Sequence, residues 1–220
     1  MSSRRVLAAI AVVVAIAVVT PVAPATADTT RTSTPGSVLT AYYDTGQWSK
    51  AIATVVKKAK ANLKKDLSSS TAPRHPAIVL DIDETSVFNA PCLEPVDWDL
   101  IGLAICAVTG QGAVTPVLSL YKYARKKDVR VVMITGRPEA LAGVTRQLLT
   151  SLGYSSGFQL VLRPPSDTRS SVVPYKSAAR AAVERRGFII LANVGDQRSD
   201  LAGGHANRRY KLPNPAYLIT

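Results

Sequence analysis

Three carboxylates stand within four positions of the sequence, directly after an apolar run. Asp81, Asp83 and Glu84 follow residues 77–80 in the segment AIVLDIDETS. Like charges this close repel one another, and a buried carboxylate is costly without a partner. A divalent cation removes that repulsion, and hard oxygen ligands suit Mg²⁺. The segment therefore predicts a magnesium site at the end of a buried strand.

Further polar clusters follow later in the chain, each beside an expected strand or helix start. They are Thr135-Gly136-Arg137, Tyr175-Lys176 and the segment GDQRSD at residues 195–200. If the strands are parallel, these clusters and the first one can meet at one edge of the sheet.

The residue types of these clusters indicate one chemistry. Asp81 and Asp196 can each offer a carboxylate oxygen to a metal, and the backbone near Asp83 can add a carbonyl. Thr135, the Gly136 amide and Lys176 would supply donors and a positive charge for an anion beside the metal. This combination is suited to phosphoryl transfer, in which charge spreads over the equatorial oxygens.

Each cluster has an ordinary structural explanation when it is taken alone. Acids often occupy turns and helix N-caps, so Asp81 and Asp83 alone are weakly specific, and Asp196 could simply cap a helix. A helix lysine such as Lys176 is commonly solvated, and Thr135-Gly136 fits any turn from a strand into a helix. The order and context of all four clusters together carry the prediction.

The elements that must position these residues alternate along the chain. Strand-like apolar runs occupy residues 77–80, 129–134, 159–162 and 188–194, and helix-like runs occupy 116–126, 139–152 and 175–186. Continuous Val, Ile and Leu runs between helices predict an α/β fold with a parallel sheet covered on both faces. Residues 89–113 fit this alternation poorly and are expected to be an insertion after the first strand.

A further helix is expected at residues 48–67, before the first strand. Its apolar residues recur at helical spacing, and lysines fill the opposite side. A basic amphipathic helix can bind membranes, but a helix that docks on a core with a solvated lysine face is commoner. We favour docking.

The first 27 residues have the layout of a secretory signal peptide. Arg4 and Arg5 precede an apolar run, and small residues at 25–27 suggest cleavage between Ala27 and Asp28. The alternative is an uncleaved anchor, but the run is short for a bilayer span. We therefore expect an exported protein without a transmembrane segment after cleavage, consisting of a flexible leader at 28–44 and one domain at 45–220.

The chain is strongly basic, with a formal net charge of +12. Removal of the signal takes away two arginines and no acid, which lowers the net charge by two to +10. Such a charge attracts nucleic acid, anionic surfaces or phosphorylated substrates. The chain lacks the interleaved aromatic residues that track single strands, so specific nucleic acid binding is not expected. The sequence does not indicate an oligomeric state.

Cys92 and Cys106 are the only cysteines. In an exported protein an even number of cysteines favours a disulfide over two buried free thiols. The bond would close a loop of about 15 residues, for roughly 3 kcal/mol in the chain-entropy model.

Several segments resemble one protein family. IVLDIDETSVFNAP, VVMITGRPE, VPYKSAAR, ANVGDQRSDL and YKLPNPAY are similar to the haloacid dehalogenase (HAD) superfamily, and within it to the class B, or subfamily IIIB, acid phosphatases. That family includes bacterial exported enzymes and plant vegetative storage proteins. The resemblance implies a Rossmann-like core, a cap inserted after the first strand, and Mg²⁺-dependent hydrolysis of small phosphomonoesters.

The resemblance also implies a role for each of the residues in the polar clusters. Asp81 would be the nucleophile that forms an aspartyl-phosphate, and Asp83 would protonate the leaving alcohol and then deprotonate water. Thr135, Gly136 and Lys176 would hold the phosphoryl oxygens. Asp81, Asp83 and Asp196 would bind the metal, Asp200 would act indirectly through the metal ligands or through water, and Arg137 would anchor its loop.

Two alternatives remain open beside this reading. Some storage-type relatives lack the nucleophile, whereas both motif aspartates, Asp81 and Asp83, are present here. A non-catalytic storage protein would bind phosphate and metal without turnover. A basic envelope or nucleic-acid-binding protein would instead bind polyanions with a steep salt dependence, but only the net charge supports it.

Overall fold

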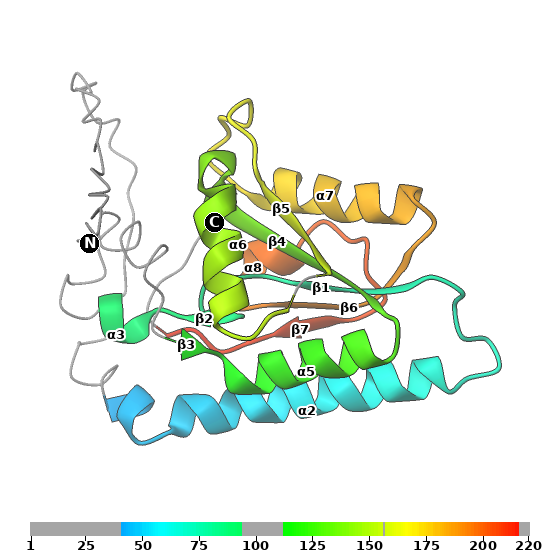
Figure 1. Cartoon of the computed structure of the whole chain (residues 1–220), viewed down its shortest axis with the longest axis horizontal. Coiled ribbons are helices and arrows are strands. Elements are labelled where there is room, and N and C mark those ends of the chain that lie inside the picture. Colours follow the sequence, from blue (N-terminus) through cyan, green and yellow to red (C-terminus); the bar gives the residue numbers. More distant parts are fainter. Residues whose placement is uncertain (1–40, 94–111, 156, 216–220) are drawn as a thin grey trace, which may run out of the picture. The chain divides into compact units, whose positions relative to one another are not determined.

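A parallel sheet forms the centre of the computed structural model, which describes residues 41–93, 112–155 and 157–215. Within these residues the sheet has five strands in the order β5-β4-β1-β6-β7, and every pair is parallel (Figure 1). The strands are β1 (Pro76–Leu80), β4 (Arg130–Pro138), β5 (Phe158–Arg163), β6 (Ile189–Gly195) and β7 (Arg209–Lys211).

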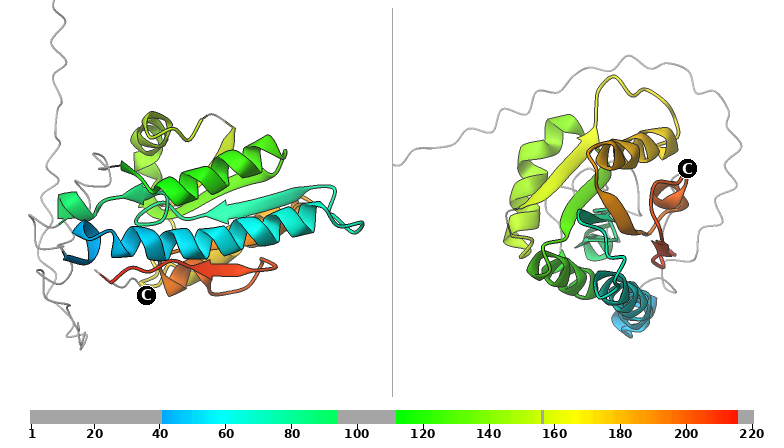
Figure 2. Two further views of the ribbon diagram at one scale, coloured as in Figure 1. Left: turned by 90° about the horizontal axis from the view of Figure 1, so that it is seen from below. Right: turned by 90° about the vertical axis from the view of Figure 1, so that its right-hand side faces the viewer.

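Helices cover both faces of this sheet (Figure 2). One face is covered by α2 (Gln47–Leu67), α5 (Thr115–Lys126) and α6 (Ala142–Ser151), and the other by α7 (Val173–Arg185). A short helix, α8 (Arg198–Leu201), follows β6. The predicted α/β architecture is confirmed.

The side-chain alternation of β1 shows why this strand lies at the centre. Ile78 and Leu80 join the core under α2 and α5, whereas Ala77 and Val79 join the core under α7. Successive strand residues point to opposite faces, so a strand between two helical layers must be apolar throughout.

α2 docks on the sheet as expected. Its buried residues recur every three or four positions and are Trp48, Ile52, Val56, Ala59 and Leu63. The lysines on the other side of the helix are mostly exposed. No helix in the described part of the chain is long and apolar enough to span a membrane.

The insertion after β1 contains a small antiparallel pair, β2 (Val87–Phe88) with β3 (Gly112–Ala113), and a short helix, α3 (Ala90–Leu93). Residues 94–111 between them lie outside the described residues, as do the signal region and most of the leader. Cys92 lies in α3 but Cys106 falls in the undescribed segment, so the disulfide stays a prediction.

Two elements differ from the sequence-based expectation. The helix expected at 139–152 begins as a 3₁₀ turn, η2 (Glu139–Leu141), because β4 continues to Pro138 before the chain turns. β7 was not expected, because it is only three residues long and Tyr210 alone among them is buried.

Candidate active site

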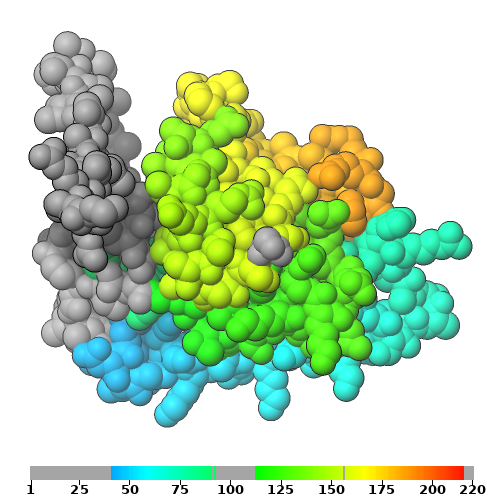
Figure 3. All heavy atoms as spheres, in the orientation of Figure 1, coloured from blue at the N-terminus to red at the C-terminus, as the bar shows by residue number. Residues whose placement is uncertain are grey.

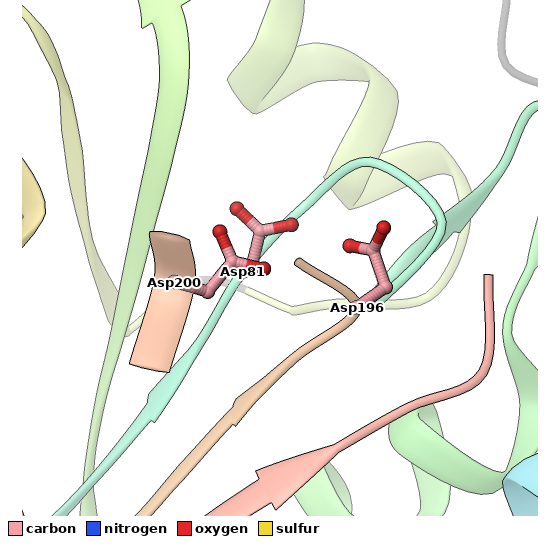
Figure 4. Close-up of side chains that lie close together, drawn as sticks. All are labelled: Asp81, Asp196 and Asp200. Carbon is pink, nitrogen blue, oxygen red and sulfur yellow. The ribbon is translucent and has the colours of Figure 1, made fainter. Parts of the chain in front are cut away.

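Three buried carboxylates meet at the carboxyl edge of the sheet (Figure 4). Asp81 directly follows β1, Asp196 directly follows β6, and Asp200 lies in α8. Each offers one carboxylate oxygen, and these three oxygens lie within 4.8 Å of one another. β1 and β6 are neighbours in register, Leu80 beside Val194, so their ends place Asp81 and Asp196 side by side.

Lys176 of α7 brings a positive charge into this cluster. Its Nζ lies 2.7 Å from Asp81 Oδ1 and 2.5 Å from Asp200 Oδ1, and the lysine is buried. Burial lowers the pKa of Lys176, but the two carboxylates raise it more, so the net pKa lies above its usual range. Lys176 therefore stays charged and holds Asp81, at the end of β1, close to Asp200 of α8.

The position of Asp200 depends on the glycine at 195. A Cβ at Gly195 would lie only 2.4 Å from Asp200 Cβ. The Asp200 carboxylate also accepts a 2.7 Å hydrogen bond from the backbone N–H of Gln197. Asp200 is thereby the acidic residue of a capping box at the start of α8. Glycine is thus required for Asp200 to approach the end of β6.

Asp196 accepts hydrogen bonds from three uncharged side chains. The donors are Thr85 Oγ1 at 2.9 Å, Gln197 Nε2 at 2.6 Å and Asn214 Nδ2 at 2.8 Å. Burial, and then repulsion by Asp200, raise the pKa of Asp196 to about 6. The same two causes, in the same order, raise the pKa of Asp81 well above its usual range.

This cluster fits a divalent cation. Three close carboxylates face one ammonium group, which leaves an excess of buried negative charge that hydrogen bonds alone do not neutralise. The atoms that these carboxylates offer to a cation are oxygens, the ligands that Mg²⁺ prefers.

The Asp83 side chain does not belong to the cluster of three carboxylates and has partners of its own. It accepts two hydrogen bonds from Arg137, from Nη2 at 2.7 Å and from Nε at 3.0 Å, and one from Asn89 Nδ2 at 2.9 Å. Burial raises the pKa of Asp83, but the Arg137 guanidinium and the hydrogen bonds lower it further, so the net pKa is below its usual range. Arg137, expected to anchor a loop, connects the end of β4 to the second motif aspartate.

Thr135 and Gly136 lie near the end of β4, on the strand next to β1. Thr135 is buried and its Oγ1 accepts a 3.1 Å hydrogen bond from the Arg137 amide, whereas Gly136 is exposed. The backbone at Gly136 is therefore accessible to an anion.

The structure thus gathers Asp81, Lys176, Asp196 and Asp200 into one cluster. The sequence predicted only an indirect role for Asp200 at the metal site. It indicated no role for three residues that hydrogen-bond to the site aspartates, Thr85, Asn89 and Asn214. Asn214 belongs to the segment YKLPNPAY, whose resemblance to the family was noted without a role for any of its residues.

Comparison with known proteins gives a consistent picture. A family model described as HAD superfamily, subfamily IIIB (acid phosphatase), matches residues 17–220. Acid phosphatase 1 of Solanum lycopersicum is 35% identical over 155 residues, which cover 64% of this chain and 58% of that protein. Vegetative storage protein 1 of Arabidopsis thaliana is 29% identical over 148 residues, covering 64% and 54%. The matched regions thus span less than two thirds of these curated relatives.

A solved structure shows the same fold. The class C acid phosphatase from Bacillus anthracis superposes with a TM-score of 0.67 at 19% identity, covering 81% of this chain and 83% of the other. At this identity the likeness concerns the fold.

Proposed function

Because this chain belongs to subfamily IIIB of the HAD superfamily, the acid phosphatases, we propose that it is an exported, Mg²⁺-dependent phosphatase of small phosphomonoesters. The observation that carries the proposal is the meeting of Asp81, Lys176, Asp196 and Asp200 at one buried strand edge. Asp81 is the nucleophile and forms an aspartyl-phosphate, which water then hydrolyses.

The charges around Asp81 suit attack on phosphorus. Lys176 and the Gly136 amide bind phosphoryl oxygens, and Lys176 also orients the attacking carboxylate through its 2.7 Å contact. Asp81, Asp196 and Asp200, with the backbone near Asp83, would hold Mg²⁺, which would neutralise charge on the phosphoryl group. Asp83 gives a proton to the leaving oxygen and later takes one from water.

The decisive experiment is hydrolysis of a chromogenic aryl phosphate by residues 28–220, with Mg²⁺ or with EDTA, beside Asp81→Asn. Turnover is expected only with metal and Asp81, and circular dichroism should show that the variant is folded. Appreciable metal-dependent turnover by Asp81→Asn would refute Asp81 as nucleophile. A folded wild type that binds phosphate and metal without turnover would favour the storage-type alternative.

Export is proposed from the N-terminal layout alone. Expression of the full chain in a secreting host should yield extracellular protein whose N-terminus, determined by mass spectrometry, is Asp28 or a residue close to it. Retention of residues 1–27 would instead indicate an anchor.

A further inference from the structure

A second charged cluster lies on the loop between β5 and α7 (yellow, at the top of Figure 1). Asp167 accepts hydrogen bonds from Arg169 Nε at 2.8 Å and Nη2 at 3.0 Å, and it lies 3.6 Å from Arg163 Nε. Two guanidinium groups share one carboxylate, so these three side chains keep a net charge of +1.

Two donors in this region lack a hydrogen-bond acceptor among the described residues. They are Arg163 Nε and the hydroxyl of Tyr175, a residue that is only 7% exposed. A buried donor without an acceptor costs free energy, and such groups call for an explanation such as an absent ligand. An anion would satisfy both donors and the excess charge.

The cluster is within reach of a substrate held at Asp81. Arg163 pairs with Pro138 of β4, and β4 lies next to β1, so Arg163 is two strand spacings, about 10 Å, from the line of β1. Tyr175 directly precedes Lys176 in α7. Val172, at the end of the loop, would lie 3.7 Å from a Cβ at Gly136.

The electrostatics agree with this placement. Burial raises the pKa of Tyr175, Lys176 lowers it, and the charges of Asp167, Asp81 and Arg163 also act on it. The hydroxyl therefore stays protonated as a donor, and charged groups of both the Asp81 site and the arginine cluster act on it.

We propose that Arg163, Arg169 and the Tyr175 hydroxyl form a subsite for a second anionic group, a carboxylate or a further phosphate, on the phosphomonoester. The inference rests on the proposed function and narrows its substrate class. Phosphomonoesters that carry a second anionic group are hydrolysed in preference to phosphomonoesters of similar size whose only anionic group is the phosphate.

The test compares phenyl phosphate with 4-carboxyphenyl phosphate and 1,4-phenylene bisphosphate. The wild type should show a higher kcat/KM for the two esters with a second anionic group, and the ratio of each value to that for phenyl phosphate should fall about tenfold in Arg169→Gln and in Tyr175→Phe. Arg185→Gln, an exposed arginine at the far end of α7, is the matched control and should keep the ratio. A larger gain for 4-carboxyphenyl phosphate would indicate a carboxylate subsite, and a larger gain for 1,4-phenylene bisphosphate would indicate a phosphate subsite.

Binding keeps this test independent of turnover. Benzylphosphonate and 4-(phosphonomethyl)benzoate cannot be hydrolysed at phosphorus. Calorimetry should show that the carboxylated compound binds more tightly to the wild type, and this difference in affinity should be lost in Tyr175→Phe. If the wild type hydrolyses no ester but keeps this difference, the phosphatase proposal fails and the subsite stands. The subsite would be overturned if the kcat/KM ratios and the phosphonate affinities did not depend on the second anionic group. It would also be overturned if the ratio fell in Arg185→Gln as much as in Arg169→Gln.

Discussion

At the scale of single residues, the two motif aspartates have opposite environments. Asp81 lies among carboxylates and one lysine, whereas Asp83 is clamped by Arg137 and Asn89. The clamp lowers the pKa of Asp83, so the group is ionised and can accept a proton from water. To act as the acid, Asp83 must take up a proton and loosen its contact with Arg137.

Asp83→Asn should therefore impair hydrolysis according to the leaving group. An alkoxide needs a proton to depart, while a nitrophenolate departs largely without one. We expect the single-turnover rate of phosphoenzyme formation to fall about 10²–10⁴-fold for an alkyl phosphate such as glycerol 2-phosphate. The same rate should fall clearly less for 4-nitrophenyl phosphate. Equal losses for both substrates would contradict the acid role.

The carboxylate cluster predicts that Mg²⁺ stabilises the fold. A cation that binds the folded state alone raises Tm, here by neutralising Asp81, Asp196 and Asp200. Differential scanning calorimetry should show a rise of several degrees from EDTA to saturating Mg²⁺, and Asp196→Asn should remove it. Asp128→Asn, an exposed acid before β4, is the control and should keep the rise; an unchanged rise in Asp196→Asn would exclude Asp196 as a ligand.

Asp81, Lys176 and Asp196 could be predicted as site residues from the sequence, because each lies directly after a strand or in the first turn of a helix. Asp200 was expected only as an indirect support of the metal site, and its place within the carboxylate cluster was not foreseeable, since it depends on the missing Cβ of Gly195. Nor was the contact of Asn89 with Asp83 foreseeable, since it arises from the turn at Glu84, where φ is 51°.

At the scale of elements, burial on both faces made the central strands predictable. β1 and β6 are apolar nearly throughout and correspond closely to the expected runs. β7 could not be predicted, since Arg209 and Lys211 are exposed and Tyr210 alone marks its inner side. Its place in the sheet comes from pairing with β6, a contact between distant parts of the chain.

α2 should contribute strongly to stability although it precedes the sheet in sequence. Ile52 is fully buried under the sheet, and its truncation leaves a cavity. Ile52→Ala should lower the free energy of unfolding by about 2–5 kcal/mol, measured by urea denaturation. Lys57→Ala, on the exposed side of the same helix, should change it by no more than about 0.5 kcal/mol. Similar losses in both variants would contradict a specific contribution of Ile52 packing to stability.

At the scale of the whole molecule, the excess of positive charge gathers on one helix. α2 exposes Lys50, Lys57, Lys58, Lys64 and Lys65, and long side chains of this helix project from the lower surface in Figure 3. Its one acid, Asp66, pairs with Arg208. The apolar side of α2 is buried, so this surface attracts anions by charge alone.

Polyanion binding by this surface should accordingly be non-specific and sensitive to salt. The chain should bind heparin at low ionic strength and elute as salt screens the lysines, because the Debye length is about 10 Å at 0.1 M. Lys57→Gln with Lys58→Gln and Lys64→Gln should elute at lower salt, while kcat on phenyl phosphate stays at the wild-type value, since the three lysines are exposed and contact none of the site residues. Arg185→Gln with Arg186→Gln, which removes charge from the end of α7, should shift elution less. An elution position that the lysine variant leaves unchanged would show that the charge of the molecule as a whole, and not α2, governs its attraction to anionic surfaces.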